Sequence, residues 1–334
     1  MNKPLVSIIT PCYNGEKFVH RYLDSILAQI YPNIELIFIN DGSTDRTEEI
    51  VLSYKNKFDI KGINFIYIYQ ENAGQTTALN KGIKIFKGDY LTWPDSDDWL
   101  INNSIQKRVE FLENNLDYAL VRSNGAFYSE KDIEECSGRI SNDKNRYNSD
   151  IFLDLIFERT FCCNGCYMLR TSEFVKVNYK REILINSAGQ NWQMLIPISY
   201  KNKCGFIDDE LYCILIRVNS HCRIHKNFND LIKRNHDLCK IQLWAINQTN
   251  NRDERLVLQI KNRFIRKNMD LCILYNNIKV FDEQYNILKK NNSIILKDKI
   301  NYLCVRNKEI KYIIKIASFI FRFLNNIRRK IIKC

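Results

Sequence analysis

Residues 90–99, Tyr-Leu-Thr-Trp-Pro-Asp-Ser-Asp-Asp-Trp, determine how the rest of the chain is interpreted. The first four are hydrophobic and predict a strand, which must end at Pro94 because proline has no amide donor for a sheet. Asp95, Asp97 and Asp98 are therefore expected on the loop at the carboxyl end of this strand, where open α/β sheets bind their ligands. Carboxylates so close together repel one another, and a divalent cation such as Mg²⁺ or Mn²⁺ removes the repulsion. The alternative is a solvated acidic turn in front of the next helix.

The same order of strand, polar loop and helix occurs three times before this stretch. The predicted strands lie at residues 5–10, 35–40 and 64–69, and helices begin near residues 18, 45 and 76. Four such units in a hundred residues predict an α/β fold, a mostly parallel sheet flanked by helices. The four loops then open on one edge of the sheet and form one pocket. These loops are residues 11–15, 41–43, 72–75 and 95–98.

No glycine-rich phosphate-binding loop follows the first strand, which leads into Pro-Cys-Tyr-Asn-Gly at residues 11–15. This argues against P-loop NTPases and ordinary dinucleotide-binding proteins. It also argues against a nucleotidyltransferase, another class of enzyme built on a similar sheet, because such an enzyme needs a Gly-rich loop with Arg or Lys after the first strand. A diphosphate ligand must find another counter-charge, and a metal ion on Asp97 and Asp98 supplies it.

The composition fits a globular protein with either one large domain and an appendage or two ordinary domains: the chain has 334 residues, of which 45% are hydrophobic. The net charge of +12 points only weakly to anionic partners, and no nucleic-acid partner is expected. Twelve scattered cysteines and no evident signal peptide predict reduced thiols in the cytoplasm. Cys162, Cys163 and Cys166 are interpreted as small buried thiols on a strand rather than zinc ligands, since no second ligand pair stands at a matching distance. No apolar run is long enough to span a membrane.

Four ordered motifs resemble the family 2 glycosyltransferases. They are Val-Ser-Ile-Ile-Thr-Pro-Cys-Tyr-Asn at residues 6–14, Asn-Asp-Gly-Ser-Thr-Asp at 40–45, Asn-Ala-Gly-Gln at 72–75 and Asp-Ser-Asp-Asp at 95–98. The resemblance covers residues 4–116 and continues more weakly to about residue 221. It implies a GT-A fold and an inverting enzyme that uses a nucleotide-diphosphate sugar, with UDP favoured, and Mn²⁺ or Mg²⁺.

The resemblance also assigns roles to individual residues. Thr10, Pro11 and Tyr13 would form one wall of the base pocket, Asp41 would accept a hydrogen bond from the base, and Gln75 would lie near the ribose or diphosphate. Asp95, Asp97 and Asp98 would be the Asp-x-Asp element, with Asp97 and Asp98 nearest the ribose and the metal and Asp98 also a catalytic residue. Arg217 and His221 belong to a segment that resembles the family's basic closing segment, Arg217 as a diphosphate contact and His221 as a further metal ligand. A surface Arg and His on a loop is the alternative.

Inverting transfer needs a base on the acceptor hydroxyl, which the family usually supplies from a Glu-Asp pair at the start of a helix. The matching place here reads Gly-Gln-Asn-Trp-Gln at residues 189–193, a variant that resembles one subgroup of the family. Amides cannot take up a proton at neutral pH, so Gln190 and Asn191 are expected to orient the acceptor. The nearby carboxylates considered as a base are Glu182, Asp208, Asp209 and Glu210. A binding protein that kept the donor pocket and lost turnover is the alternative.

Three regions are expected along the chain. Residues 1–225 form the GT-A domain, with a nucleotide-sugar half (1–116) and an acceptor half (117–225), and residues 226–308 form a helical extension. Residues 309–334 read as a basic amphipathic helix that suits an anionic lipid surface, although packing on its own domain or on a partner gives the same pattern. The expectation is a cytoplasmic protein, peripheral on the inner face of the cell membrane. A saccharide or lipid-linked saccharide acceptor, in polysaccharide or glycolipid biosynthesis, would suit that location.

Overall fold

Residues 3–186, 188–217, 227–251 and 253–307 are described by a computed structural model of the chain. The chain divides into two compact units, which are considered separately. The first comprises Met1–His225 and Lys240–Arg252, and the second comprises Lys226–Cys239 and Asp253–Cys334.

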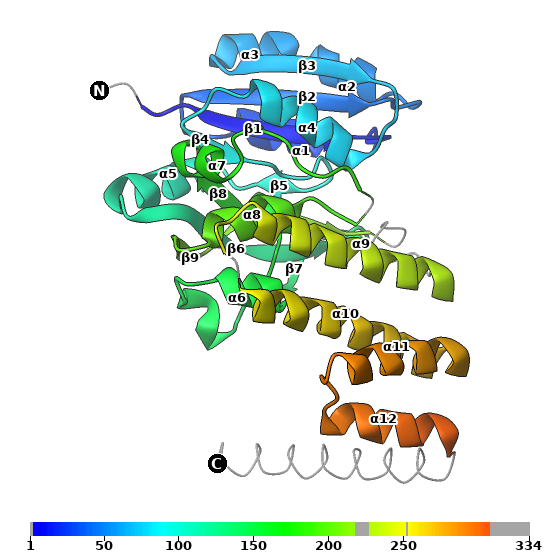
Figure 1. Ribbon diagram of the computed structural model, residues 1–334. Coiled ribbons are helices and arrows are strands. Elements are labelled where there is room, and N and C mark those ends of the chain that lie inside the picture. Colours follow the sequence, from blue (N-terminus) through cyan, green and yellow to red (C-terminus); the bar gives the residue numbers. More distant parts are fainter. Residues whose placement is uncertain (1–2, 187, 218–226, 252, 308–334) are drawn as a thin grey trace, which may run out of the picture. The chain divides into compact units, whose positions relative to one another are not determined.

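The first four strands of the first unit form a parallel sheet in the order β3-β2-β1-β4, as predicted (Figure 1). They are β1 (Val6–Cys12), β2 (Ile34–Asp41), β3 (Asn64–Gln70) and β4 (Tyr90–Thr92). Every residue of β1, β2 and β4 is buried, because both faces of these strands are covered. All four carboxyl ends therefore meet at one edge of the sheet.

Helices connect these strands: α1 (Val19–Leu27), α2 (Thr47–Ser53), α3 (Lys55–Lys61) and α4 (Gln75–Ile85). Apolar residues at 18, 22, 26 and 30 recur at the helical period and predict a helix that reaches Ile30, but α1 ends at Leu27 and Ile30 is 54% exposed. The chain turns away because the buried Gln29 amide donates to the carbonyls of Ser25 and Ile101. Gly82 lets α4 approach the sheet closely, since a Cβ there would lie 2.3 Å from a methyl carbon of Ile9.

The sheet continues beyond β4 through strands of mixed direction, in the order β4-β8-β6-β9-β5, with β7 paired to β6. These are β5 (Trp99–Leu100), β6 (Tyr118–Ser129), β7 (Asp132–Arg139), β8 (Tyr167–Arg170) and β9 (Lys203–Ile216). The helices of this half are α5 (Ser104–Asn114), α6 (Phe152–Ile156), α7 (Thr171–Val177) and α8 (Asn191–Ser199), with the 3₁₀ turns η1 (Lys144–Tyr147) and η2 (Asn164–Cys166).

Several sequence predictions for this half were wrong in detail. The polar sequence of residues 125–148 predicts an irregular segment, but β6 runs on to Ser129 and forms a hairpin with β7. The mostly exposed β7 has no apolar alternation that could reveal it. The sequence predicts two short strands, at 206–209 and 211–216, but these residues belong to the single strand β9, whose register against β6 shifts at its polar middle. The cysteines at 163 and 166 flank and end η2 rather than lying on a strand.

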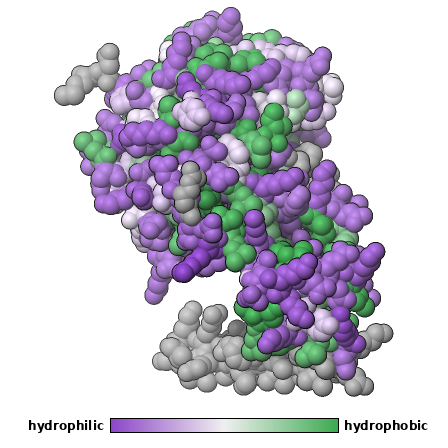
Figure 2. All heavy atoms as spheres, viewed as in Figure 1, coloured by the Kyte–Doolittle hydropathy of each residue, from purple (hydrophilic) through white to green (hydrophobic). Residues whose placement is uncertain are grey.

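The second unit is helical. Helices α10 (Glu254–Leu274), α11 (Ile278–Lys290) and α12 (Leu296–Arg306) enclose a small core of Met269, Cys272, Phe281 and Leu288. Helix α9 (Phe228–Asn247) contributes its first part to this unit and its second part to the other. Among the described helices none has the length and apolar character needed to cross a bilayer. The predicted helix at 309–334 lies outside the described residues. Figure 2 shows mostly hydrophilic side chains on the face in view, with hydrophobic ones scattered among them.

Candidate active site

The loops after β1 and β2 are tied together by hydrogen bonds. The backbone amide of Asn14 donates to Ser43 Oγ at 3.0 Å, and Asn14 Oδ1 accepts from the amide of Thr44 at 2.8 Å. The amide of Gly15 donates to Thr47 Oγ1 at 2.8 Å. These bonds hold the first two predicted loops side by side.

Asp41 links the second loop to the third. Its buried carboxylate accepts from Gln70 Nε2 at 2.6 Å and from the amides of Ala73 and Gly74, each at 2.9 Å. A carboxylate has about four acceptor positions, so little capacity is left for the base contact expected of Asp41. Gln75 then donates Nε2 to Asp95 Oδ1 at 3.0 Å and joins the third loop to the fourth. The structure thus brings all four predicted loops together.

The three carboxylates of the fourth loop converge. One oxygen from each of Asp95, Asp97 and Asp98 lies within 4.8 Å of the others. Burial, reinforced by the negative charge of Asp97, raises the pKa of Asp95 to about 7 and raises the pKa of Asp98 well above its ordinary value. Carboxylates that resist ionisation in this way are stabilised by a cation between them, and an all-oxygen donor set is what Mg²⁺ and Mn²⁺ prefer.

Arg217 supplies part of the missing positive charge. Its guanidinium lies 2.7 Å from Asp97 Oδ2 and packs over the Phe18 ring at 5.0 Å. The sequence placed Arg217 against a diphosphate, and the structure places it at the carboxylate expected to share an ion with that diphosphate. A second arginine, Arg21, donates to the carbonyl of Asp97 at 2.9 Å and lies over the Trp99 ring. Both arginines help to shape the fourth loop.

Tyr212 on β9 supports the carboxylates and was not foreseen. Its hydroxyl donates to Asp98 Oδ2 at 2.7 Å and accepts from the amide of Asp95 at 3.1 Å. The other oxygen of Asp98 accepts from the amide of Leu215 at 2.8 Å. The Tyr212 ring packs directly on Gly165, where a Cβ would lie 2.1 Å from it. Nothing in the strand pattern distinguishes Tyr212 from other aromatic residues.

Buried Arg108 on α5 continues this support. It donates to the carbonyl of Gly165 at 2.8 Å and to the hydroxyl of Ser104 at 2.6 Å. Burial lowers its pKa to about 10, and its described hydrogen-bond partners are all neutral oxygens. A buried guanidinium without a carboxylate partner is costly, but the hydrogen bond of Arg108 to the Gly165 carbonyl holds the residue on which the Tyr212 ring packs.

Asn191 at the start of α8 uses both ends of its amide within the protein. Its Oδ1 accepts from Trp93 Nε1 and its Nδ2 donates to the carbonyl of Cys162, each at 3.0 Å. Asn164 donates to the carbonyl of Trp93 at 2.8 Å. Asn191 therefore braces the strand end that carries the carboxylates. Its neighbour Gln190 precedes α8 and is buried, and its expected contact with the acceptor stays a prediction.

The three residues expected to line the pocket for the nucleotide base differ in exposure. The Thr10 hydroxyl hydrogen-bonds the Tyr22 hydroxyl inside the core, so this side chain is directed toward α1. Pro11 is buried at the end of β1, and Tyr13 is 48% exposed on the loop beyond it. Of the three, Tyr13 presents the most surface to a base. His221 lies outside the described residues.

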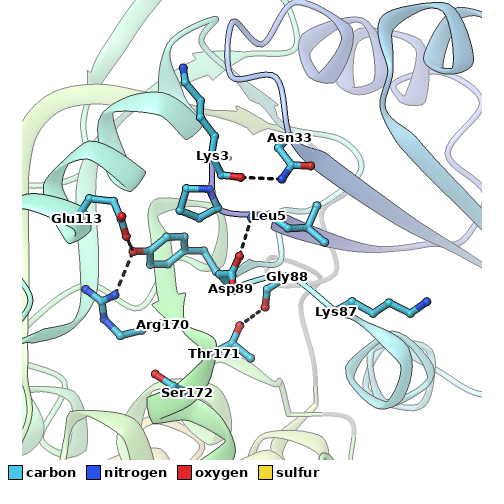
Figure 3. A pocket seen from close by; sticks show the side chains of 12 residues that line it. Lys3, Leu5, Asn33, Lys87, Gly88, Asp89, Glu113, Arg170, Thr171 and Ser172 are labelled. Carbon is cyan, nitrogen blue, oxygen red and sulfur yellow. Dashed lines mark hydrogen bonds between the residues drawn. The ribbon is translucent and has the colours of Figure 1, made fainter. Parts of the chain in front are cut away.

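A cavity of about 730 Å³ lies at the opposite, amino-terminal edge of the sheet (Figure 3). Its polar groups are largely engaged with one another. The amide of Leu5 donates to Asp89 at 2.8 Å, and Arg170 donates to the Tyr90 hydroxyl at 3.0 Å. Ligands of parallel α/β sheets bind at the carboxyl edge, so the four joined loops, and not this cavity, form the candidate site.

Residues 7–176 match the family model described as Glycosyl transferase family 2. The chain belongs to this family. The predicted family is therefore confirmed, and the match contains the four motifs that carried the resemblance except for the first residue, Val6.

Similar proteins named glycosyltransferases match between 34% and 38% of the chain. An uncharacterised glycosyltransferase of Rickettsia typhi is 48% identical over 114 residues, which is 34% of this chain and 33% of that protein. One of Haemophilus influenzae is 41% identical over 128 residues, or 38% of this chain and 49% of that protein. The glycosyltransferase GlyA of Streptococcus pneumoniae is 37% identical over 130 residues, or 37% of this chain and 18% of that protein. The chain thus matches less than half the length of each.

Solved structures confirm the predicted GT-A fold. TarS of S. aureus, crystallised with UDP-GlcNAc, superimposes with a TM-score of 0.57 over 90% of this chain and 79% of its own, at 15% identity. The mannosyltransferase PcManGT of Pyrobaculum calidifontis, in complex with GDP-Man and Mn²⁺, gives a TM-score of 0.55 over 96% of this chain and 86% of its own, at 13% identity.

The carboxylates considered as substitutes for the family 2 base are mostly committed elsewhere. Asp208 is paired with Arg139 and Arg146, and the Arg146 hydrogen bond helps lower its pKa to about 2, which makes it a weak proton acceptor. Asp209 pairs with Lys107, and Glu210 pairs with Arg139 at 2.6 Å. Glu182 is exposed on the segment before α8. Sequence proximity alone did not identify a base.

Proposed function

We propose that this family 2 protein transfers a sugar, with inversion, from a nucleotide-diphosphate sugar to a hydroxyl of a saccharide acceptor and depends on Mn²⁺ or Mg²⁺. The observation that carries the proposal is the cluster of Asp95, Asp97 and Asp98 at the edge where four loops are joined. TarS with UDP-GlcNAc and PcManGT with GDP-Man and Mn²⁺ support this class of donor and ion. UDP is the favoured nucleotide.

The residues have separable tasks in this reaction. Asp97 and Asp98 would hold the ion, which when bound neutralises charge that develops on the leaving diphosphate. Arg217 adds a positive charge beside Asp97. Tyr13 offers an exposed aromatic ring to the base, and Gln75 borders the carboxylates at the start of α4. Gln190 is the amide expected to orient the acceptor.

A binding protein without turnover is the second candidate. One observation favours it: the Asn191 side-chain amide is hydrogen-bonded to Trp93 and to the carbonyl of Cys162 instead of facing an acceptor. In addition, amides occupy the place of the usual carboxylate base. Such a protein would keep the donor site and lack the proton acceptor that inverting transfer requires.

Calorimetry with a panel of UDP- and GDP-sugars, with and without Mn²⁺, tests the proposal. Binding of one donor that needs Mn²⁺, followed by transfer or slow hydrolysis, is the expected result. Tight donor binding with neither transfer nor hydrolysis would establish the binding protein instead. Absence of binding for every donor would refute both candidates.

A lipid-linked saccharide acceptor, in polysaccharide or glycolipid synthesis, is part of the proposal, with the 309–334 segment as an anchor. Deleting residues 309–334 is expected to weaken association with anionic vesicles, because seven Lys and Arg alternate with apolar residues there. Donor hydrolysis should be unchanged. Flotation with vesicles measures the first effect, and full vesicle binding by the truncated protein would remove the anchor from the proposal.

A further inference from the structure

Residues 178–186 run back along helix α4 and are held against it at three places. Arg181 Nη2 donates to the carbonyl of Phe86 at 2.7 Å. The Asn80 side chain accepts from the amide of Ile183 at 2.7 Å and donates to its carbonyl at 2.8 Å. The Thr76 hydroxyl accepts from the amide of Asn186 at 3.2 Å and donates to its carbonyl at 3.0 Å. Because these contacts follow α4 from its carboxyl end to its amino end, the segment is fixed along the whole helix.

Three large apolar side chains of this segment nevertheless face solvent. Tyr179 is 74% exposed, Leu184 is 37% exposed and Ile185 is 64% exposed. Single exposed hydrophobic residues are ordinary, but here three large apolar side chains within seven residues are kept exposed on a segment that hydrogen bonds hold in place.

The solvent face of α4 beside this segment is basic. Its buried face includes Ala78, Leu79 and Ile83, whereas Lys81 and Lys84 are exposed. Lys84 lies between Asn80 and Phe86, the two residues in and just after α4 that bond Ile183 and Arg181, so it lies beside the segment that carries the apolar side chains. Within the described part of the chain these two lysines form no ion pair.

The sequence neighbours of these residues add further exposed positive charge. Lys87 lies just beyond the carboxyl end of α4, and Lys180 lies between Tyr179 and the Arg181 that bonds Phe86. The exposed acidic residue of α4 and of residues 178–186 is Glu182, so the exposed lysines outnumber the exposed acidic residues.

We propose that these residues form a binding surface for an anionic lipid bilayer. The α4 surface, as we call it, consists of Tyr179, Lys180, Leu184 and Ile185 from the segment and Lys81 and Lys84 from the helix. The surface combines lysines with aromatic and aliphatic side chains. The anionic headgroups of such a bilayer attract the ammonium groups, and the apolar side chains enter the interface. The charge of the surface selects this occupant over an uncharged protein face.

The α4 surface adjoins the candidate site. Helix α4 begins at Gln75, whose amide bonds Asp95 at 3.0 Å, and the pinned segment ends beside Thr76. A bilayer on this surface would therefore lie at the rim of the site, where a lipid-linked acceptor would arrive. The proposal goes beyond the proposed function, does not depend on it and does not involve residues 309–334.

Vesicle flotation of the full chain tests the proposal. The variant Lys81→Glu/Lys84→Glu/Ile185→Ser is expected to lose at least about twentyfold in partitioning to phosphatidylglycerol-containing vesicles, since each basic residue contributes about fivefold. The matched control Lys55→Glu/Lys61→Glu/Ile60→Ser makes the same changes on α3, where Ile60 is 80% exposed. It should lose much less. Equal losses in both variants, unchanged binding of the first, or no binding of the parent chain would overturn the proposal.

A substitution that leaves the charge intact provides a second readout. Ile185→Trp should gain fluorescence quenching by brominated lipids, whereas Ile60→Trp should not; quenching at neither position contradicts insertion. Donor binding, measured on the same samples, should be unchanged by every substitution, because none touches the carboxylates. If the parent chain bound no donor, this result would count against the proposed function and not against the bilayer surface.

Discussion

Asp97→Asn is expected to weaken Mn²⁺ binding by at least about a hundredfold and to remove the metal dependence of donor binding. Changes to residues that merely support a metal ligand cost about 10- to 100-fold in affinity, and removal of a charged ligand should cost no less. Asp97 is the natural target because, unlike Asp98, its carboxylate is held by an arginine side chain that an incoming ion can replace. Isothermal calorimetry with Mn²⁺, and then with the donor, measures both effects.

Arg217→Gln is the matched control for this experiment. It breaks the same 2.7 Å ion pair but leaves the carboxylate in place, so Mn²⁺ should bind at least as tightly as to the parent protein. Binding of diphosphate should weaken instead, because one positive charge is lost. Retained manganese dependence in Asp97→Asn would refute the assignment of this carboxylate to the metal.

Tyr212→Phe is expected to loosen the fourth loop and weaken Mn²⁺ binding by about 10- to 100-fold without unfolding the protein. The substitution leaves Asp98 Oδ2 and the amide of Asp95 without their shared partner. Each buried polar group left unpaired costs about 1–3 kcal/mol. Hydrogen exchange of residues 93–100 should accelerate, and this readout does not depend on the metal.

Tyr167→Phe serves as the control, since the Tyr167 hydroxyl donates to the carbonyl of Phe161 at 2.8 Å and does not touch the carboxylates. The melting temperatures of the two variants should fall by similar amounts, while only Tyr212→Phe changes exchange at 93–100 and affinity for Mn²⁺. Identical exchange and affinity in both variants would show that Tyr212 merely fills the core.

Residues near one another in sequence could be assigned before the structure was known. The apolar, β-branched run at β1 and the strand end at Pro94 are local signals, and they placed Asp95, Asp97 and Asp98 on a loop at the carboxyl edge. The prediction that residues 125–148 are irregular was wrong because β7 is an exposed edge strand, and such a strand needs no alternation of apolar residues. Sequence proximity was likewise unable to single out a base: Asp208, Asp209 and Glu210 follow α8 closely in sequence, but each is paired with an arginine or a lysine.

The sequence by itself determined the parallel α/β half, its family and the loops that carry the acidic side chains, because strand period, proline and motif spacing are properties of short stretches. Only the tertiary structure decided which groups hold those loops in place. Tyr212 and Asn191 come from strands and helices more than ninety residues away from the carboxylate loop. Contacts of that range depend on how β9 and α8 pack, and neither residue type nor spacing encodes them locally.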